Sequence, residues 1–388
     1  MSDKALITPS VIQWARETAR FSLVEAAKKL GVKPAILLSW ETNEASPTMN
    51  QALKMSRVYR RSLSVFFLPE PPKDFQTLRD FRRTDHAREY SPALTFILRE
   101  VQFRQNWIKE VLHEEEEDPL PFIGKFSVND QVDVVASDIA STLQIKDDIT
   151  SSDRLKYWIH KVESKRIFVS LGSNIHSRMV FDVDEFRGFA VSDPMCPFIF
   201  INTKDARQAQ LFTLVHELVH LWINASGVSR EIAPAFRETE SDVLDPVEVF
   251  CNRVSAKLLM PDDWFNEVFP SGSKISLEVI DDAAKQLQLS SKAVIVYLLN
   301  SGKIVRQVFY SFWNRIDNRN EALRSRFSET PVEKKGFADP NLMKVRKCGY
   351  SLSNIILGSY KSGRISPLEA SSLLDVKVNN FSKLERFL

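Results

Sequence analysis

Residues 212–221 read Phe-Thr-Leu-Val-His-Glu-Leu-Val-His-Leu, and they contain the pattern H-E-x-x-H at His216, Glu217 and His220. Positions i and i+4 of an α-helix share one face, so both imidazoles can bind a single ion. Glu217 lies beside them, where it can take a proton from a water molecule activated by that ion. Neutral imidazoles and a carboxylate suit Zn²⁺, which leaves one position open for water. The stretch therefore predicts a buried zinc-binding helix, and the competing interpretation is a buried helix with two unrelated histidines.

A third metal ligand is predicted from the segment that follows residue 244. Asp245 is a good N-cap and Pro246 fits the first helical position, so a helix is expected to begin there. Glu248 then lies in its first turn, with Asn252 one turn later on the same face. We expect Glu248 to be the third ligand and Asn252 to form a supporting hydrogen bond. Alternatively, Glu248 is an exposed acid that the helix dipole favours.

These two segments together resemble the ImmA/IrrE family of zinc metallopeptidases. The second motif of that family reads E-x-x-A-N-x-F-A-x-x-L-L-M-P, and it is matched by Glu248, Asn252, Ala256 and residues 258–261. Cys251 and Val254 depart from it, at positions that affect packing rather than the ligands. Gly188-Phe, residues 199–202 and Arg207-Gln208 also look like the family's approach to its metal helix. The resemblance implies a zincin-like peptidase core.

Composition places the chain among ordinary globular proteins. It has 388 residues, of which 44% are hydrophobic and 26% charged, and its formal net charge is +2. Two or three domains are expected at this length. Three scattered cysteines and no C-x-x-C pair favour a reducing compartment such as the cytoplasm. No apolar run is long enough to span a membrane, so no membrane partner is expected.

Residues 8–68 are predicted to form a compact all-helical unit. Ser22 and Glu25 form a capping box at the start of one helix, and Gly31 ends it. A short helix over residues 35–41 follows after a turn, and another begins at Thr48. This order is typical of a helix-turn-helix, and it resembles the Xre-type (Cro/repressor-like) module.

The residues expected to contact DNA in that module are Lys33, Ser39, Thr42 and Asn43. Base recognition needs polar side chains at the start of the recognition helix, but residues 33–39 are mostly apolar. Residues 1–90 carry 15 Lys and Arg against 10 Asp and Glu, a mild excess that suits phosphate contacts. The alternative is a four-helix module that docks a protein partner.

The remaining chain is predicted to be α+β and predominantly helical. We expect helices near residues 92–113, 130–143 and 151–163, and then three short strands within residues 166–170, 185–192 and 197–201. The strand at residues 198–202 is the predicted sheet edge that would hold an extended substrate. The predicted domains are a helix-turn-helix (1–68), a linker with bridging helices (69–150), a metallopeptidase core with a small sheet (151–265) and a C-terminal helical region with a helix-turn-helix-like unit (266–388).

The chemistry expected of this arrangement is zinc-dependent peptide hydrolysis, with Glu217 as the general base. The biological role is implied by the resemblance alone. Members with an Xre module are similar to antitoxins encoded beside a toxin and to anti-repressor proteases that cleave a repressor. We therefore expect an antitoxin-type regulator with a protein partner, either a toxin or a repressor. A non-catalytic antitoxin that sequesters its toxin and represses its own promoter is the alternative.

Overall fold

The structure, a computed structural model, describes residues 4–72, 79–80, 90–146, 150–176, 179–225, 227–229, 245–270, 272–329 and 339–388. The chain divides into two compact units. The first comprises residues 1–77, 86–103 and 174–181, and the second comprises residues 78–85, 104–173 and 182–388. Residues 73–78 and 81–89 of the linker predicted at 69–150 fall outside the described residues. The domain boundaries at residues 68, 150 and 265 stay a prediction.

The first unit is built on four short helices and a 3₁₀ turn, and the local sequence explains where they begin and end. The Glu25 N–H donates to Ser22 Oγ at 3.2 Å, and the Ser22 N–H donates to the Glu25 carboxylate at 3.0 Å. Gly31 ends the second helix at φ +68°, a conformation that glycine adopts without a steric penalty. The elements are α1 (Pro9–Thr18), α2 (Leu23–Leu30), α3 (Pro34–Glu41), α4 (Met49–Tyr59) and η1 (Leu63–Phe67).

A buried ion pair joins the first and third of these helices. Arg16 Nε donates to Glu41 Oε1 at 2.8 Å, and the Arg16 and Glu41 side chains are 12% and 4% exposed. The guanidinium also donates from Nη2 to Glu41 Oε2 at 2.9 Å, so the pair is bidentate. This contact fixes α3 against α1 within the unit. α2 and α3 follow one another after a turn of three residues, so the predicted order of helix, turn and second short helix is confirmed.

The second unit is organised around a mixed sheet with the strand order β1-β7-β5-β6-β2. β6 pairs in parallel with β2 and antiparallel with β5, while β7 pairs antiparallel with β5 and in parallel with β1. The strands are β1 (Arg79–Asp80), β2 (Phe168–Gly172), β5 (Gly188–Val191), β6 (Phe198–Asn202) and β7 (Gly227–Ser229). A separate hairpin of β3 (Asn174–His176) and β4 (Met179–Val180) belongs to the first unit.

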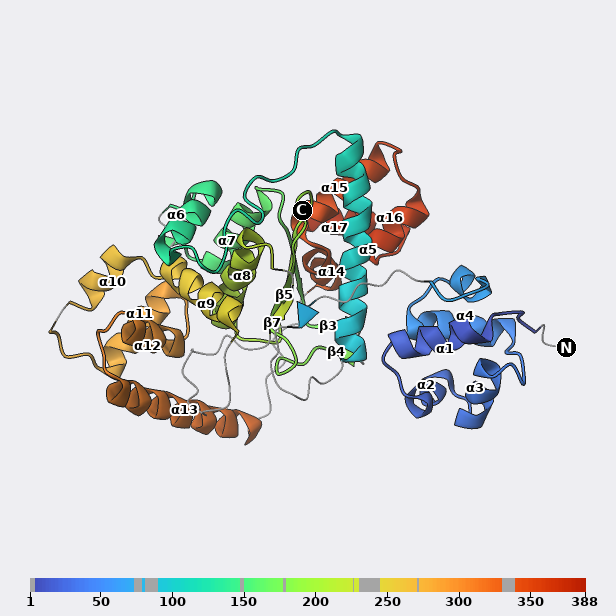
Figure 1. Cartoon of the computed structure of the whole chain (residues 1–388), viewed down its shortest axis with the longest axis horizontal. Helices are drawn as coiled ribbons and strands as arrows, with labels where there is room; N and C mark the ends of the chain where they lie inside the picture. Colours follow the sequence, from blue (N-terminus) through green and yellow to red (C-terminus); the bar gives the residue numbers. More distant parts are fainter. Residues whose placement is uncertain are drawn as a thin grey trace. The chain divides into compact units, whose positions relative to one another are not determined.

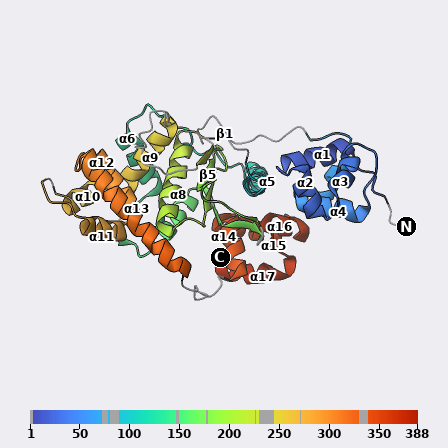
Figure 2. The same ribbon diagram turned by 90° about the horizontal axis from the view of Figure 1, so that it is seen from below.

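Both faces of this sheet are covered by helices. Val169 and Ile199 belong to the main hydrophobic core with α8 (Arg207–Trp222). Successive residues of a strand point to opposite faces, and on the other face Ser170 Oγ donates to the Cys348 carbonyl at the end of α14 (Pro340–Cys348). Figure 1 shows α8 and α14 on opposite sides of the strands, and the view from below agrees with it (Figure 2). Every residue of β2, β5 and β6 is consequently buried.

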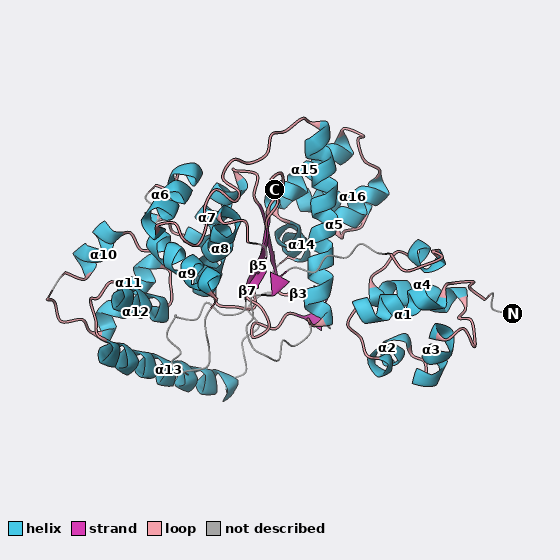
Figure 3. Cartoon of the chain, viewed as in Figure 1, coloured by secondary structure: helices cyan, strands magenta, loops and turns pink. Residues whose placement is uncertain are grey.

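Among the described residues the other elements are helical, as the secondary-structure colouring shows (Figure 3). α5 (Pro92–Glu114) begins in the first unit and ends in the second. The remaining helices are α6 (Val132–Leu143), α7 (Arg154–Glu163), α9 (Pro246–Leu259), α10 (Asp262–Val268), α11 (Leu277–Leu287), α12 (Ser291–Asn300), α13 (Arg306–Glu329), α15 (Tyr350–Lys361), α16 (Pro367–Leu374), η3 (Val378–Asn380), α17 (Phe381–Leu384) and η4 (Glu385–Phe387).

The predominantly helical α+β fold predicted from the sequence is confirmed, but one prediction about the sheet is wrong. β6, predicted to be the substrate-binding edge, has a hydrogen-bonded neighbour on each side. Its backbone groups are already paired with β2 and β5, so it has no free edge to offer an extended peptide. None of the described helices is both long enough and apolar enough to cross a membrane.

Candidate metal centre

The two histidines of the H-E-x-x-H pattern lie on a helix that is buried on all sides. α8 runs through the core of the second unit, and its residues from Gln210 to Trp222 are all buried. His216 and Glu217 are 0% exposed, and His220 is 1% exposed. Buried ionisable groups are costly unless they are paired or bind a metal. We therefore expect a nearby charged partner or a metal ion that offsets the cost of burying His216, Glu217 and His220.

That partner comes from the start of α9. Asp245 accepts a hydrogen bond from the Val247 N–H at 3.0 Å, and Pro246 occupies the first helical position, as the sequence predicted. Glu248 consequently lies in the first turn, where α9 packs on α8. Its side chain is 14% exposed, so Glu248 is not the freely exposed acid of the alternative interpretation.

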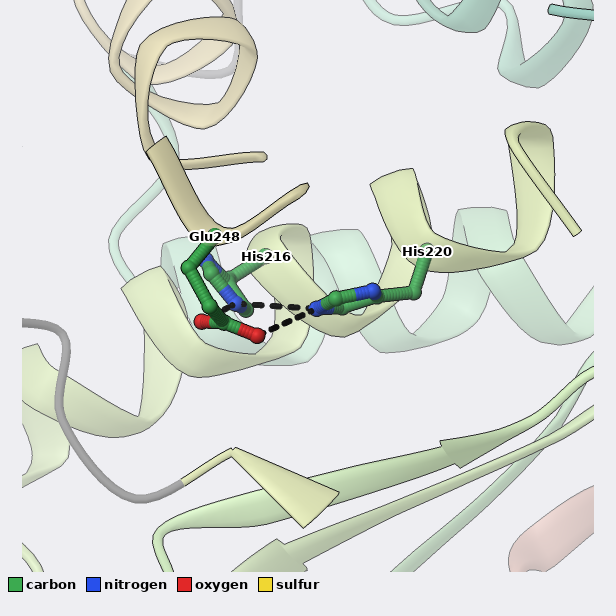
Figure 4. A group of neighbouring side chains, drawn as sticks. All are labelled: His216, His220 and Glu248. Atoms are coloured by element: carbon green, nitrogen blue, oxygen red, sulfur yellow. Dashed lines mark hydrogen bonds and ion pairs between the residues drawn. The ribbon is translucent and has the colours of Figure 1, made fainter. Parts of the chain in front are cut away.

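Three side chains meet at one point (Figure 4). His216 Nε2 lies 3.1 Å from His220 Nε2 and 3.1 Å from Glu248 Oε2. His220 Nε2 lies 3.4 Å from Glu248 Oε1. Ligand atoms about 2.0–2.1 Å from a tetrahedral Zn²⁺ stand about 3.3 Å apart, so these separations fit that ion. Two imidazole nitrogens that face each other beside a carboxylate form a donor set that a divalent cation can satisfy.

The electrostatics of the cluster follow from burial and from the closeness of its members. Burial lowers the pKa of His220 below its ordinary value. Burial acts the same way on His216, but the Glu248 charge and hydrogen bond outweigh it and raise the His216 pKa. Burial alone would raise the Glu248 pKa, yet the two imidazoles hold it well below its usual range. Glu248 is therefore a carboxylate at neutral pH, which is the form that binds a metal.

Two neighbouring residues support this arrangement. Asn252 lies one turn after Glu248 on α9, and as a hydrogen-bond partner of His216 it contributes to the raised pKa of that imidazole. Gly188 of β5 lies against the carboxylate of Glu217. A Cβ atom at Gly188 would stand 2.6 Å from Thr213 Cγ2 and 3.1 Å from Glu217 Oε1. The role of Gly188 in admitting Glu217 was missed, although an isolated glycine inside a strand often marks a close approach.

The four candidate DNA contacts are placed differently, because they are spread along α3 and not gathered at one point. Lys33 is the exposed N-cap of α3, whereas Thr42 and Asn43 are exposed at its other end. Ser39 Oγ donates to the Ile36 carbonyl at 2.8 Å, and Thr42 Oγ1 donates to the Leu38 carbonyl at 3.1 Å. The eight residues of α3 span roughly 12 Å, so the two ends can reach separate phosphates.

Comparisons with known proteins match two parts of the chain. The family model described as the IrrE N-terminal-like domain matches residues 174–298. The model described as a helix-turn-helix matches residues 12–66. No curated protein matches the chain. The resemblance to the ImmA/IrrE family with an N-terminal helix-turn-helix is thereby confirmed, and the matched peptidase-type region contains His216, His220 and Glu248.

Proposed function

We propose that this chain, an IrrE N-terminal-like domain behind a helix-turn-helix domain, is a DNA-binding regulator and a zinc-dependent endopeptidase. The observation that carries the proposal is the convergence of His216, His220 and Glu248, whose ligand atoms all lie within 4.8 Å of one another. Glu217 adjoins them on the same buried helix. Two histidines, a carboxylate from a later helix and an acid adjacent to the first histidine are the components of a zinc peptidase site.

Each residue has a separate role in this proposal. His216, His220 and Glu248 hold the ion, and Asn252 orients the imidazole of His216. A Zn²⁺ ion held by these residues would supply the Lewis acid that polarises the scissile carbonyl and would lower the pKa of a water molecule to near neutrality. Glu217 accepts the proton of the attacking water and delivers it to the leaving amine. The backbone of β5 at Gly188 keeps the Glu217 carboxylate in place.

The proposed biological role is that of an antitoxin in a toxin–antitoxin pair, with the toxin as the protein partner. It is supported by the resemblance of the two-domain arrangement to regulators of that type. The alternative role is that of an anti-repressor protease, which would use the same peptide hydrolysis to cleave a repressor. We place the protein in the cytoplasm, because its three cysteines are free and buried and the helix-turn-helix domain requires access to DNA.

A second candidate function is a non-catalytic antitoxin that binds its toxin and represses its own promoter. The observation in its favour is the apolar surface of the helix-turn-helix unit. Ile36 and Leu38 of α3 are 43% and 47% exposed, and Val24 of α2 is 64% exposed. Exposed apolar side chains on neighbouring helices are typical of a protein-binding surface. In that case the metal centre serves as a scaffold.

A paired pull-down distinguishes the two functions. Wild type and the Glu217→Gln variant are expressed with the neighbouring genes of the native host, and the captured partner is mapped by mass spectrometry of its termini. We expect a partner that is cut by wild type and captured whole by Glu217→Gln. Capture of the same intact partner by both proteins would establish sequestration and overturn the peptidase proposal.

A further inference from the structure

A cavity of about 480 Å³ in the second unit is lined by an excess of positive charge. It lies away from the metal cluster, beside the N-terminal ends of α7 and α8, the end of β2 and the helices α14 and α15. The lining cations come from three segments of the chain, and one acid, Asp153, accompanies them. The cations are Lys156, Lys204, Arg207 and Arg346.

The one acid does not neutralise this charge. Asp153 is already ion-paired with Arg207, whose side chain remains 58% exposed. Lys204 is exposed and Arg346 is half-buried, and neither forms an ion pair with another residue in the part of the chain that the structure describes. Four cations and one acid leave a net charge of about +3 on the lining. A concave surface of one sign concentrates ligands of the opposite sign.

A neighbouring cavity of about 440 Å³ shows that this excess is not a general feature of the region. It shares Arg207 with the first cavity and adds Lys285, and its acid is Asp281. Asp281 accepts hydrogen bonds from Arg319 and from Ser291. Two cations and one acid leave a net charge of about +1 on this second lining, compared with about +3 on the first, so its attraction for an anion is weaker.

The basic cavity also has an apolar and aromatic part. Tyr350, the first residue of α15, lines it together with Met343 of α14, Leu155 and Leu171. A planar ring of a ligand can pack on an aromatic side chain and an apolar wall, whereas its phosphate oxygens can accept hydrogen bonds from lysine and arginine. Ligand pockets typically have volumes of about 300–1,000 Å³. The volume of this cavity, about 480 Å³, lies in that range and suits a ligand of nucleotide size.

We propose that this cavity binds a phosphate-bearing ligand of nucleotide size. Lys204, Arg207 and Arg346 contact the phosphates, and Tyr350 packs on the base. Arg207 is the first residue of the helix that carries His216 and His220, and Arg346 belongs to the C-terminal helices. A bound ligand therefore touches both the metal helix and the C-terminal region. This site is additional to the proposed peptidase and does not depend on it.

The test is a titration of the full chain with a fluorescent N-methylanthraniloyl-ADP, followed by competition with unlabelled ADP, pyrophosphate and adenosine. The double variant Lys204→Glu and Arg346→Glu is compared with Lys383→Glu, which changes an exposed lysine of α17 outside the cavity. We expect the double variant to weaken binding by about tenfold or more, because two favourable contacts become repulsive. Lys383→Glu is expected to change it less than about twofold.

Hydrogen exchange provides a second readout that does not rely on substitution. Saturating ADP is expected to slow exchange in residues 203–210 and 343–350, the segments that contribute Lys204, Arg207, Arg346 and Tyr350. Absence of saturable binding to wild type, or equal binding by all variants, would overturn the proposal. So would competition by adenosine as strong as that by ADP, or by pyrophosphate as strong as that by ADP. Displacement by a DNA oligonucleotide at lower concentrations than ADP would instead indicate a nucleic-acid site.

Discussion

The helix α8, which carries the H-E-x-x-H pattern, and the helix α3 of the helix-turn-helix unit were both identified from short sequence patterns, but their candidate residues differ in burial and in spacing. His216 and His220 are 0% and 1% exposed, and their ring nitrogens meet at 3.1 Å. On α3 the four polar candidates are spread from Lys33 to Asn43, and Ile36 and Leu38 among them are exposed. Two histidines spaced four residues apart on a helix lie on the same face, so the helix itself brings their ring nitrogens close together. The exposed side chains of a helix such as α3 are not held together by a common ligand. Their spacing therefore does not show whether the helix binds DNA or a protein.

The strongest test of this contrast is neutralisation of Glu217. We expect Glu217→Gln to lower the rate of partner cleavage by about 10³-fold, because a general base typically contributes 10²–10⁴-fold. Zinc content measured by mass spectrometry should stay at the wild-type level, since the ligands are untouched. Glu267→Gln, which neutralises an exposed acid on α10, is the matched control and should retain full activity.

The companion substitution His216→Ala should remove both the zinc and the activity. It deletes one of the three ligand atoms and leaves His220 and Glu248 to bind the ion alone. Full zinc content in purified His216→Ala would show that the ligand assignment is wrong, whatever its activity.

A smaller effect is expected from Gly188→Ala, which tests how closely β5 packs on α8. The added methyl would stand 2.6 Å from Thr213 Cγ2 and 2.9 Å from the Phe200 carbonyl oxygen, and the latter cannot rotate away. We expect the free energy of unfolding to fall by about 1–3 kcal/mol, as for other overpacked cores. Urea denaturation monitored by circular dichroism measures it.

Gly358→Ala is the matched control for that measurement. Gly358 lies inside α15, and a Cβ atom there would meet no atom within 4 Å. Alanine is favoured over glycine in a helix interior by roughly 0.5–1 kcal/mol, so this variant should be unchanged or more stable. Equal destabilisation of both variants would contradict the close approach at Gly188.

The smallest expected effect concerns the recognition helix. Lys33→Ala should weaken binding to the protein's own promoter DNA by about threefold to tenfold and reduce the salt-dependence slope by about one. Fluorescence anisotropy at several salt concentrations measures both, with Lys383→Ala as the control in the other unit. An unchanged slope would mean that Lys33 touches no phosphate, and it would favour the protein-docking interpretation of α3.

The success and failure of the individual fold predictions have physical causes. α5 was predicted at residues 92–113 and observed at Pro92–Glu114. This prediction succeeded because the helical spacing of apolar residues can be recognised within the segment itself. The placement of β6 at an edge was wrong because its parallel neighbour, β2, lies about 30 residues upstream, and periodicity does not reveal pairing. Residues 266–388 were predicted to be helical, but α14 was not placed within them, since its residues mix charged and apolar types without a clear face and its burial arises from packing on β2.

The sequence by itself determined the spacing of His216, Glu217 and His220, the caps of α2 and α9 and the alternation of helices and strands, because each depends on neighbours within one or two turns. Only the tertiary structure decided that Glu248 meets the imidazoles, that Gly188 lies against Glu217 and that Lys156, Lys204, Arg207 and Arg346 line one cavity. These residues belong to segments far apart in the chain. Their proximity follows from how the helices pack on both faces of the sheet, which no local pattern encodes.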